Sequence, residues 1–294
     1  MAGETNKTAQ QHPRRASAPP LEFLTLTVRC PVCNTEFTSE IPNPGAPVGR
    51  ETDLRPLFAG LDPLPSLIQS CPSCRYTAYQ SGYDGGLEEV EELIESLAQR
   101  PGDRAASRLP RLEENELDEL RRWIRRGMLA QGIAEGREPF GAERYLLAAR
   151  CHEYVEDDDP LVLADYYLRA AWCARASGLT SLERECQREA VVRFEAALED
   201  ATLITESDKP RLLYLIGELS RRGGDFAKAV DFFTQLESAH ENLDADDLEA
   251  VLFEQLAKRM LALAVVKSDV NAGLPEEELE LERDDEYEFE EDEE

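Results

Sequence analysis

Histidine is scarce in this chain, with three residues among 294, so most of the sequence lacks the commonest catalytic base. His12 lies in a polar leader, and the other two are His152 and His240. The chain also lacks the His-Glu-x-x-His helix of zinc proteases, the phosphate loop and the Gly-x-Ser-x-Gly nucleophile elbow. These absences argue against the enzymes that are built on those motifs.

Basic residues are also few, with 32 lysines and arginines against 61 acidic residues and a net charge of −29. The segment Pro275–Glu294 holds fourteen acidic residues and one arginine, or −13, which leaves −16 for the rest. Such a chain does not suit general binding to a phosphate backbone, although a local nucleic-acid site remains open.

Long apolar runs are missing, so we expect no membrane span and no secretory signal in the first twenty residues. The chain has seven cysteines, and an odd number is unusual for a secreted protein with disulfides. We therefore expect a cytoplasmic protein whose thiols stay reduced.

Two cysteine pairs near the start carry the strongest chemical signal. Cys30 and Cys33 are separated by two residues, as are Cys71 and Cys74. This gap lets both sulfurs of a pair turn toward one point, so two pairs predict a four-thiolate structural zinc site with one ion per chain. The 37 residues between the pairs exceed the roughly 15–20 of a compact zinc ribbon, which indicates an insertion.

The same four thiolates could also bind iron, because zinc is favoured over iron here only by its availability. The alternative to a shared metal site is that each cysteine pair acts as a separate dithiol, one of them redox-active. That interpretation needs a βαβ pattern around a pair, and the sequence shows none there. Cys151, Cys173 and Cys186 lie in helical patterns and are interpreted as small core residues. A second metal site made from them and His152 is the less favoured alternative.

We expect a mostly α protein in four parts. Residues 1–20 read as a disordered leader, and residues 21–86 as a β-rich, zinc-ribbon-like module with a proline-rich insertion at 41–66. Residues 87–268 read as an antiparallel helical domain, and residues 269–294 as a disordered acidic tail. The apolar spacing predicts helices at 87–99, 113–130, 140–155, 161–177, 181–203, 209–222, 225–239 and 245–267.

One stretch follows the spacing of a tetratricopeptide repeat, around Gly217, the turn 224–226, Ala229 and Phe233. Gly217 and Ala229 are small where the two helices must touch. Residues 166–198 resemble a second, looser unit. An ordinary α-helical bundle without a repeat groove is the alternative.

Several motifs together resemble a known family. They are the two cysteine pairs, the segment 51–56 (ETDLRP), residues 143–145 (ERY), residues 170–172 (AAW) and residues 214–222 (YLIGELSRR). In this order they resemble the bacterial family called domain of unknown function 2225, over about residues 28 to 240. The resemblance implies an architecture rather than an activity. In that family a glycine usually follows the second pair, where this chain has Arg75, so Arg75 reshapes the turn if glycine takes a positive φ there.

Three functions are compatible with these features. The first is a non-enzymatic adaptor or scaffold that binds a protein or peptide partner, because the thiolate shell is closed and the helices are amphipathic. The second is a nucleic-acid- or transcription-associated zinc ribbon that uses Arg29, Arg50, Arg55 and Arg75. The third is a metal-dependent enzyme at Cys151–Glu153 and Asp157–Asp159, although that cluster is interpreted as the end of a helix and a loop.

Overall fold

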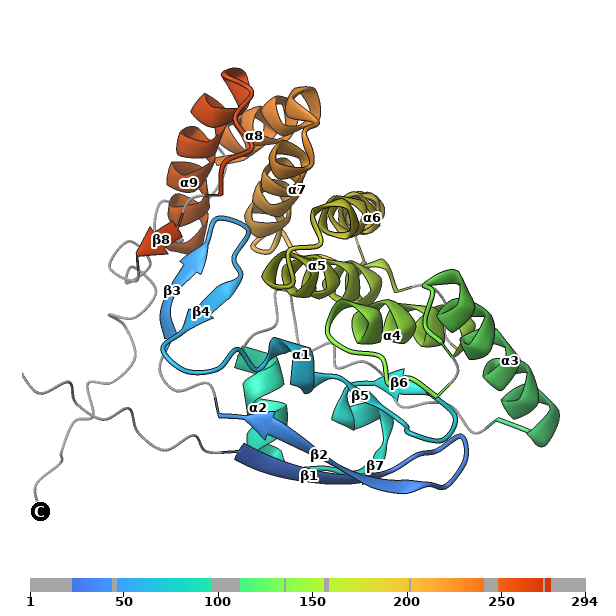
Figure 1. The fold of residues 1–294 in the computed structure, drawn as a ribbon. Helices are drawn as coiled ribbons and strands as arrows, with labels where there is room; N and C mark the ends of the chain where they lie inside the picture. The colour runs from blue at the N-terminus through green and yellow to red at the C-terminus, as the bar shows by residue number, and fades with distance from the viewer. Residues whose placement is uncertain are drawn as a thin grey trace, which may run out of the picture.

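The structure is a computed structural model that describes residues 23–43, 47–96, 112–134, 136–155, 159–200, 202–240, 248–271 and 273–275. The described chain is mostly helical, with short antiparallel strands concentrated near its beginning (Figure 1). This confirms the expected mostly α fold with a β-rich four-cysteine region at the front. The expected leader 1–20 and residues 276–294 of the expected tail lie outside the described residues.

The N-terminal region forms small sheets rather than one continuous sheet. Its elements are β1 (Phe23–Arg29), β2 (Glu36–Pro42), β3 (Pro47–Glu51), β4 (Pro56–Phe58), α1 (Leu64–Leu67), β5 (Gln69–Ser70), β6 (Thr77–Ala78), η1 (Gln80–Gly82) and β7 (Asp84–Gly85). The strand orders are β2-β1-β7, β4-β3-β8 and β5-β6. Strand β1 alternates in burial, with Leu26 and Val28 facing the core, as a half-buried strand requires.

The proline-rich insertion contains no long helix, as its composition predicts, but it is more ordered than the sequence indicates. It forms the β3–β4 hairpin and the one-turn helix α1. Pro56 begins β4, an edge strand, where a missing N–H costs little. The insertion thereby places its hairpin tip, residues 52–55, beside the helices.

Eight longer helices follow within the described ranges, each within a few residues of its expected position. They are α2 (Glu88–Ser96), α3 (Glu114–Ala130), α4 (Ala142–Val155), α5 (Pro160–Ala176), α6 (Thr180–Glu199), α7 (Lys209–Gly223), α8 (Phe226–His240) and α9 (Leu248–Val265). Asp159 caps α5 by accepting from the backbone of Leu161 and Val162, and Gly224 ends α7 at φ 90°.

Helices α3 to α9 form a stepped row that covers the N-terminal sheets (Figure 1). Helix α5 is buried around almost its whole circumference, which places it at the centre of the row. Helices α7 and α8 meet where the sequence predicts: a Cβ at Gly217 would lie 2.6 Å from the ring of Phe233, and Ala229 is fully buried. Glycine is required there because the two helices approach so closely.

The chain returns to its beginning through β8 (Gly273–Pro275), which pairs with β3. The sequence places these residues in the acidic tail, because three residues are too few for a strand pattern. The physical reason for their order is burial of the Leu274 side chain together with backbone pairing to β3.

One apolar core runs through both regions. Buried side chains of the sheets and of the helices belong to a single cluster from Leu26 to Leu274. Tyr79 donates to Asp165 on α5 at 3.0 Å, and Tyr145 on α4 donates to the carbonyl of Leu64 at 2.7 Å. Within the described ranges, no helix is both long and apolar enough to cross a membrane.

Candidate metal centre

The two cysteine pairs form two turns of nearly identical geometry. The first joins β1 to β2: Cys30 N donates to Thr35 O at 2.9 Å, and Asn34 N donates to Cys30 O at 2.8 Å. The second joins β5 to β6, with Cys71 N to Tyr76 O at 2.8 Å and Arg75 N to Cys71 O at 3.0 Å. We call these turns the two knuckles; in each, the amides hold the backbone so that both thiols point to one side.

The residue after each second cysteine is left-handed. Asn34 has φ 60° and Arg75 has φ 65°. This conformation suits glycine and is tolerated by asparagine, whereas a long side chain is strained there. The arginine takes the glycine conformation, and the second knuckle keeps the hydrogen bonds of the first, so the expected reshaping of the turn is not seen.

The knuckles face each other and bring four sulfurs together, two from each side of the 37-residue separation. Cys30 Sγ lies 3.5 Å from Cys74 Sγ, and Cys33 Sγ lies 3.5 Å from Cys71 Sγ. All four sulfurs lie within 4.8 Å of one another. A tetrahedral zinc ion with bonds of about 2.3 Å needs sulfurs about 3.8 Å apart, so the cluster has the right size for a metal ion.

The pKa values of the clustered thiols are also consistent with a site for a cation. Hydrogen bonds from Cys30 and Cys74 lower the pKa of Cys71, whereas hydrogen bonds to Cys30 and Cys71, together with burial, raise the pKa of Cys74. Neighbouring thiolates repel one another, and a positive ion within the cluster would relieve that repulsion. All seven cysteines are free thiols, and Cys30 and Cys71 are fully buried.

Aromatic side chains and α3 support the knuckles from outside. The hydroxyl of Tyr83 donates to the carbonyls of Gln69 and Tyr76, at 2.9 and 2.7 Å, and so braces the second knuckle. Arg121 of α3 donates to the carbonyl of Val32 at 2.7 Å and braces the first. The knuckles are therefore attached to the helical row as well as to each other.

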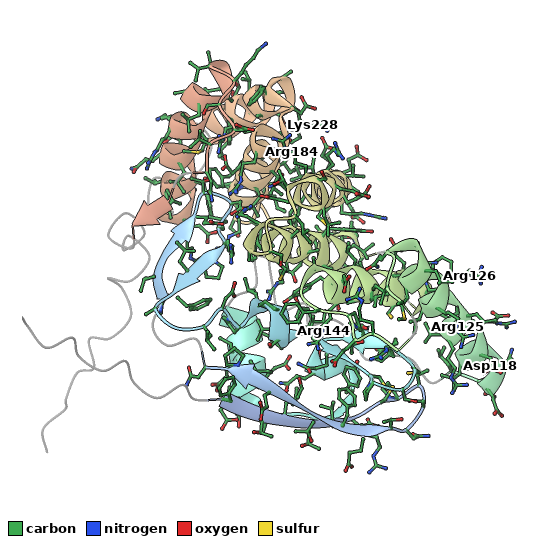
Figure 2. The ribbon with its side chains drawn as sticks, in the orientation of Figure 1. Asp118, Arg125, Arg126, Arg144, Arg184 and Lys228 are labelled. Carbon is green, nitrogen blue, oxygen red and sulfur yellow. The ribbon has the colours of Figure 1, made fainter. Side chains whose placement is uncertain are left out.

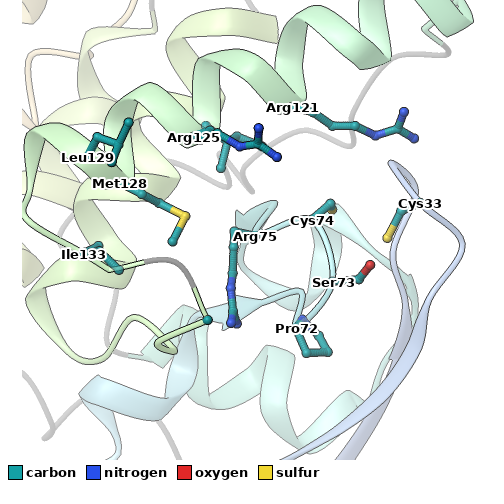
Figure 3. Close-up of a pocket in the computed structure, with 12 residues that line it drawn as sticks. Cys33, Pro72, Ser73, Cys74, Arg75, Arg121, Arg125, Met128, Leu129 and Ile133 are labelled. Carbon is teal, nitrogen blue, oxygen red and sulfur yellow. The ribbon is translucent and has the colours of Figure 1, made fainter.

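A cleft of about 420 Å³ lies between the second knuckle and α3. Figure 3 shows Arg121 and Arg125 on α3, with Arg121 extending toward Cys33 and the side chain of Arg75 directed away from α3; all three arginines line the cleft. Arg121 also pairs with Asp118 at 2.7 Å. The cleft is a local concentration of positive charge in an acidic chain.

A second motif, ETDLRP, has a structural role that sequence reasoning missed. Residues 52–55 form the tip of the β3–β4 hairpin, which we call the buried loop; Thr52 and Asp53 are fully buried. Arg175 of α5 pairs with Asp53, and Arg222 of α7 pairs with it at 3.1 Å. Arg175 also binds Glu183 of α6 at 2.7 Å, so this group of ion pairs links three helices.

The other half of the buried loop is held by α7. The hydroxyl of Thr52 donates to Glu218, and Tyr214 donates to the carbonyl of Thr52 at 2.7 Å. Arg221 makes two hydrogen bonds to Glu218, at 2.7 and 2.8 Å, with both side chains fully buried. The IGELSRR segment of α7 thus binds the ETDLRP loop.

The electrostatics of Asp53 follow from its partners. Burial alone would raise the pKa of its carboxyl, but the charges of Arg175 and Arg222 outweigh it and lower the pKa to about 2. Asp53 is therefore ionised at neutral pH, and the loop is held by charge. No sequence signal separates this aspartate from the other acidic residues, because its partners lie more than 100 positions away.

The remaining sequence candidates are dispersed. Arg29 pairs with Glu36, and Arg55 pairs with Asp62 and more distantly with Glu51, so both arginines are engaged in ion pairs within the fold. Arg122 donates to the carbonyl of Asp118 rather than to its carboxylate. Figure 2 shows Asp118, Arg125 and Arg126 along α3, where Asp118 already pairs with Arg121.

The polar cluster at the end of α4 does not form a ligand set. Cys151 and His152 are buried in α4, and Asp159 serves as the cap of α5. Asp157 and Asp158 lie outside the described residues. Among the residues that the structure describes, the four cysteines are the one group of three or more potential ligands that converge.

The geometry defines a class of protein: a paired-knuckle, four-cysteine region fixed to a row of helical hairpins. The chain belongs to the family described as "Uncharacterized protein conserved in bacteria (DUF2225)", whose family model matches residues 23–255. The match covers both knuckles, the buried loop and helices α2 to α8. No curated protein and no solved structure matches the chain at a significant level.

Proposed function

We propose that this protein is a non-enzymatic, zinc-binding adaptor that holds a protein or peptide partner on its helical domain. One structural zinc ion per chain is bound by Cys30, Cys33, Cys71 and Cys74. The observation that carries the proposal is the convergence of four sulfurs into a closed shell, which leaves no position for substrate or water on the ion.

Metal analysis of the freshly reduced, full-length protein tests the first half. We expect one equivalent of zinc, no colour and no visible charge-transfer bands. A red protein with such bands would identify iron on the same thiolates and would replace zinc in the proposal. Absence of any metal would remove the structural-ion part altogether.

The adaptor role is supported by the paired helices. The α7–α8 pair has the close Gly217–Phe233 contact of a tetratricopeptide-like unit, and stacked pairs of this kind offer concave surfaces to partners. The free thiols suit the cytoplasm, the compartment that we propose. Affinity capture with the full chain tests this half, and failure to enrich any specific protein partner contradicts it.

One observation favours a second candidate, binding of nucleic acid at the N-terminal region. The cleft beside the second knuckle gathers Arg75, Arg121 and Arg125, and among the described residues Arg75 has no ion-pair partner. Binding of the full chain to single- and double-stranded DNA and RNA at low salt tests it, since low salt favours phosphate contacts. The candidate is abandoned if the chain binds neither DNA nor RNA. It is also abandoned if Arg75→Glu leaves the affinity for nucleic acid unchanged.

A further inference from the structure

Side chains of α3, α4 and α6 line a groove along the helical row. Figure 1 shows the position of these three helices. It consists of two adjoining cavities, of about 880 and about 400 Å³. The two cavities share the lining residues Ala130, Gln131, Leu146, Leu182 and Glu185, so they form one continuous depression. We call it the α3–α6 groove. Its size exceeds what a small ion needs and suits the side chains of a polypeptide.

The groove is partly apolar. Leu146 of α4 and Leu182 of α6 are only half-buried within it. At one end the side chains of Phe140 and Leu179 are 60 % and 50 % exposed. Large apolar side chains gathered at a concave surface mark a binding site more often than scattered ones do.

One wall of the groove is acidic. Glu185 and Glu189 lie one helical turn apart on α6, and both are exposed. In the described part of the chain, no lysine or arginine forms an ion pair with either of them. Two neighbouring carboxylates without a counter-charge repel each other, and a cationic ligand would relieve that repulsion.

The positive charges that line the groove are already engaged. Arg137 makes two hydrogen bonds to Glu143. Arg150 lies 3.9 Å from the ring centre of Trp123 and donates to the Trp123 carbonyl at 3.0 Å. The carboxylates of the acidic wall are therefore the charged groups of the groove that a ligand can pair with. The chain's net charge of −29 also attracts cations from a distance.

We infer that the α3–α6 groove binds a cationic amphipathic segment of a partner polypeptide. Its lysines or arginines pair with Glu185 and Glu189, and its large apolar side chains cover Leu146, Leu182 and Phe140. The inference rests on the proposed adaptor function and names the chemistry of the partner. A phosphate-bearing ligand is disfavoured because it would meet the same carboxylates.

The test selects peptides from a random 12-residue phage-displayed library on the full-length protein as purified. We expect the enriched sequences to combine Lys or Arg with Leu, Ile, Phe or Trp. The strongest synthetic peptide is then titrated against the double variant Glu185→Lys with Glu189→Lys. We expect its affinity to fall about tenfold or more, because attraction at two positions becomes repulsion.

A matched control separates the groove from the overall charge. Glu88 and Glu92 are exposed and also one turn apart, on α2. The variant Glu88→Lys with Glu92→Lys changes the net charge equally, and we expect less than about a twofold loss. Phe140→Ala should weaken binding, whereas Phe23→Ala, an exposed phenylalanine on β1, should not.

Each outcome decides between the two proposals. Enrichment of acidic or uncharged peptides overturns the inference, as does binding that is equally sensitive to both double variants. Peptides that bind but ignore the groove variants leave an adaptor with a different site. If no peptide is enriched, the inference that the groove binds a peptide fails. The affinity-capture experiment with the full chain then decides whether the protein is an adaptor.

Discussion

The two knuckles and the buried loop hold irregular backbone in different ways. Each contains a non-glycine residue in the left-handed conformation: Asn34 and Arg75 in the knuckles, and Leu54, with φ 65°, in the loop. The knuckles converge on a cluster that a metal ion can fill, with all four ligands from the N-terminal region. The buried loop instead relies on ion pairs with Arg175 and Arg222, supplied by distant helices.

The knuckles are therefore held by nearby residues, whereas the buried loop is held by helices that are distant in the sequence. A metal ion can stabilise the knuckles with ligands that lie within 45 residues of one another. The buried loop has no such independence, because its counter-charges reach it only after α5, α6 and α7 have packed. We therefore expect damage to the knuckles to remain near the sheets and damage to the loop to destabilise the whole helical row.

The largest expected effect comes from breaking the knuckles. Cys71→Ala removes one of the four ligands, and structural zinc contributes roughly 10–16 kcal/mol of apparent binding energy to folding. We expect the variant to lose its metal and to lose hydrogen-exchange protection over the knuckles and their strands, residues 23–42 and 69–85, while the buried loop keeps its own. Helices α7 to α9 should keep most of theirs.

Cys186→Ala provides the control, because Cys186 is as buried as Cys71 but lies outside the cluster. It should retain one metal ion per chain. Elemental analysis and hydrogen exchange measure both variants, and a Cys71→Ala protein that keeps its metal would contradict the four-ligand account.

Breaking the buried loop should have the next largest effect. Asp53→Ala removes the fully buried carboxylate that Arg175 and Arg222 share and leaves them the less buried Glu51 and Glu183, at a cost of about 3 kcal/mol. Urea unfolding followed by circular dichroism should show a single transition at lower denaturant, because the whole row is affected. Asp62→Ala, which removes a more exposed partner of Arg55, should cost about 1 kcal/mol or less.

The pH dependence of stability sharpens the same contrast. The pKa of Asp53 is lowered to about 2 in the folded protein, from an ordinary value near 4. Its contribution is therefore complete above pH 4 and is lost as the pH falls toward 2. We expect Asp53→Asn to flatten the stability curve by about 2 kcal/mol across this window, measured by thermal unfolding at constant salt. An unchanged curve would mean that the carboxyl is not held by charge.

The smallest effect concerns the left-handed residue of the second knuckle. Arg75→Gly should stabilise the protein by about 1 kcal/mol, because glycine adopts this φ without strain. Arg75→Ala removes the same guanidinium but keeps the strain, so it should give no such gain. Differential scanning calorimetry distinguishes them, and equal melting temperatures for the two variants would remove backbone strain as the cause.

Much of the fold was predictable because its signals are local. The period of apolar residues located the eight long helices, and the two-residue gaps between cysteines indicated the cluster that the structure brings together. The close contact of α7 with α8 followed from Gly217 and Ala229, whose small size is visible in the sequence.

What could not be predicted depends on partners that are distant in sequence. Asp53 resembles any other acidic residue until α5 and α7 bring Arg175 and Arg222 to it. Strand β8 has three residues and too little pattern to be recognised, and only its pairing with β3 defines it. The acidic wall of the α3–α6 groove likewise reads as an ordinary solvated helix face until α3 and α4 are placed opposite α6.

The pairing of β8 with β3 also bears on how the protein is made. During synthesis the β3–β4 hairpin emerges early, yet the strand that completes its sheet is more than 200 residues away. Until then the outer edge of β3 exposes unpaired amides and carbonyls, which invite pairing with other chains. A nascent chain that stalls before residue 273 would therefore carry an open edge, a target for chaperones and a seed for misassembly.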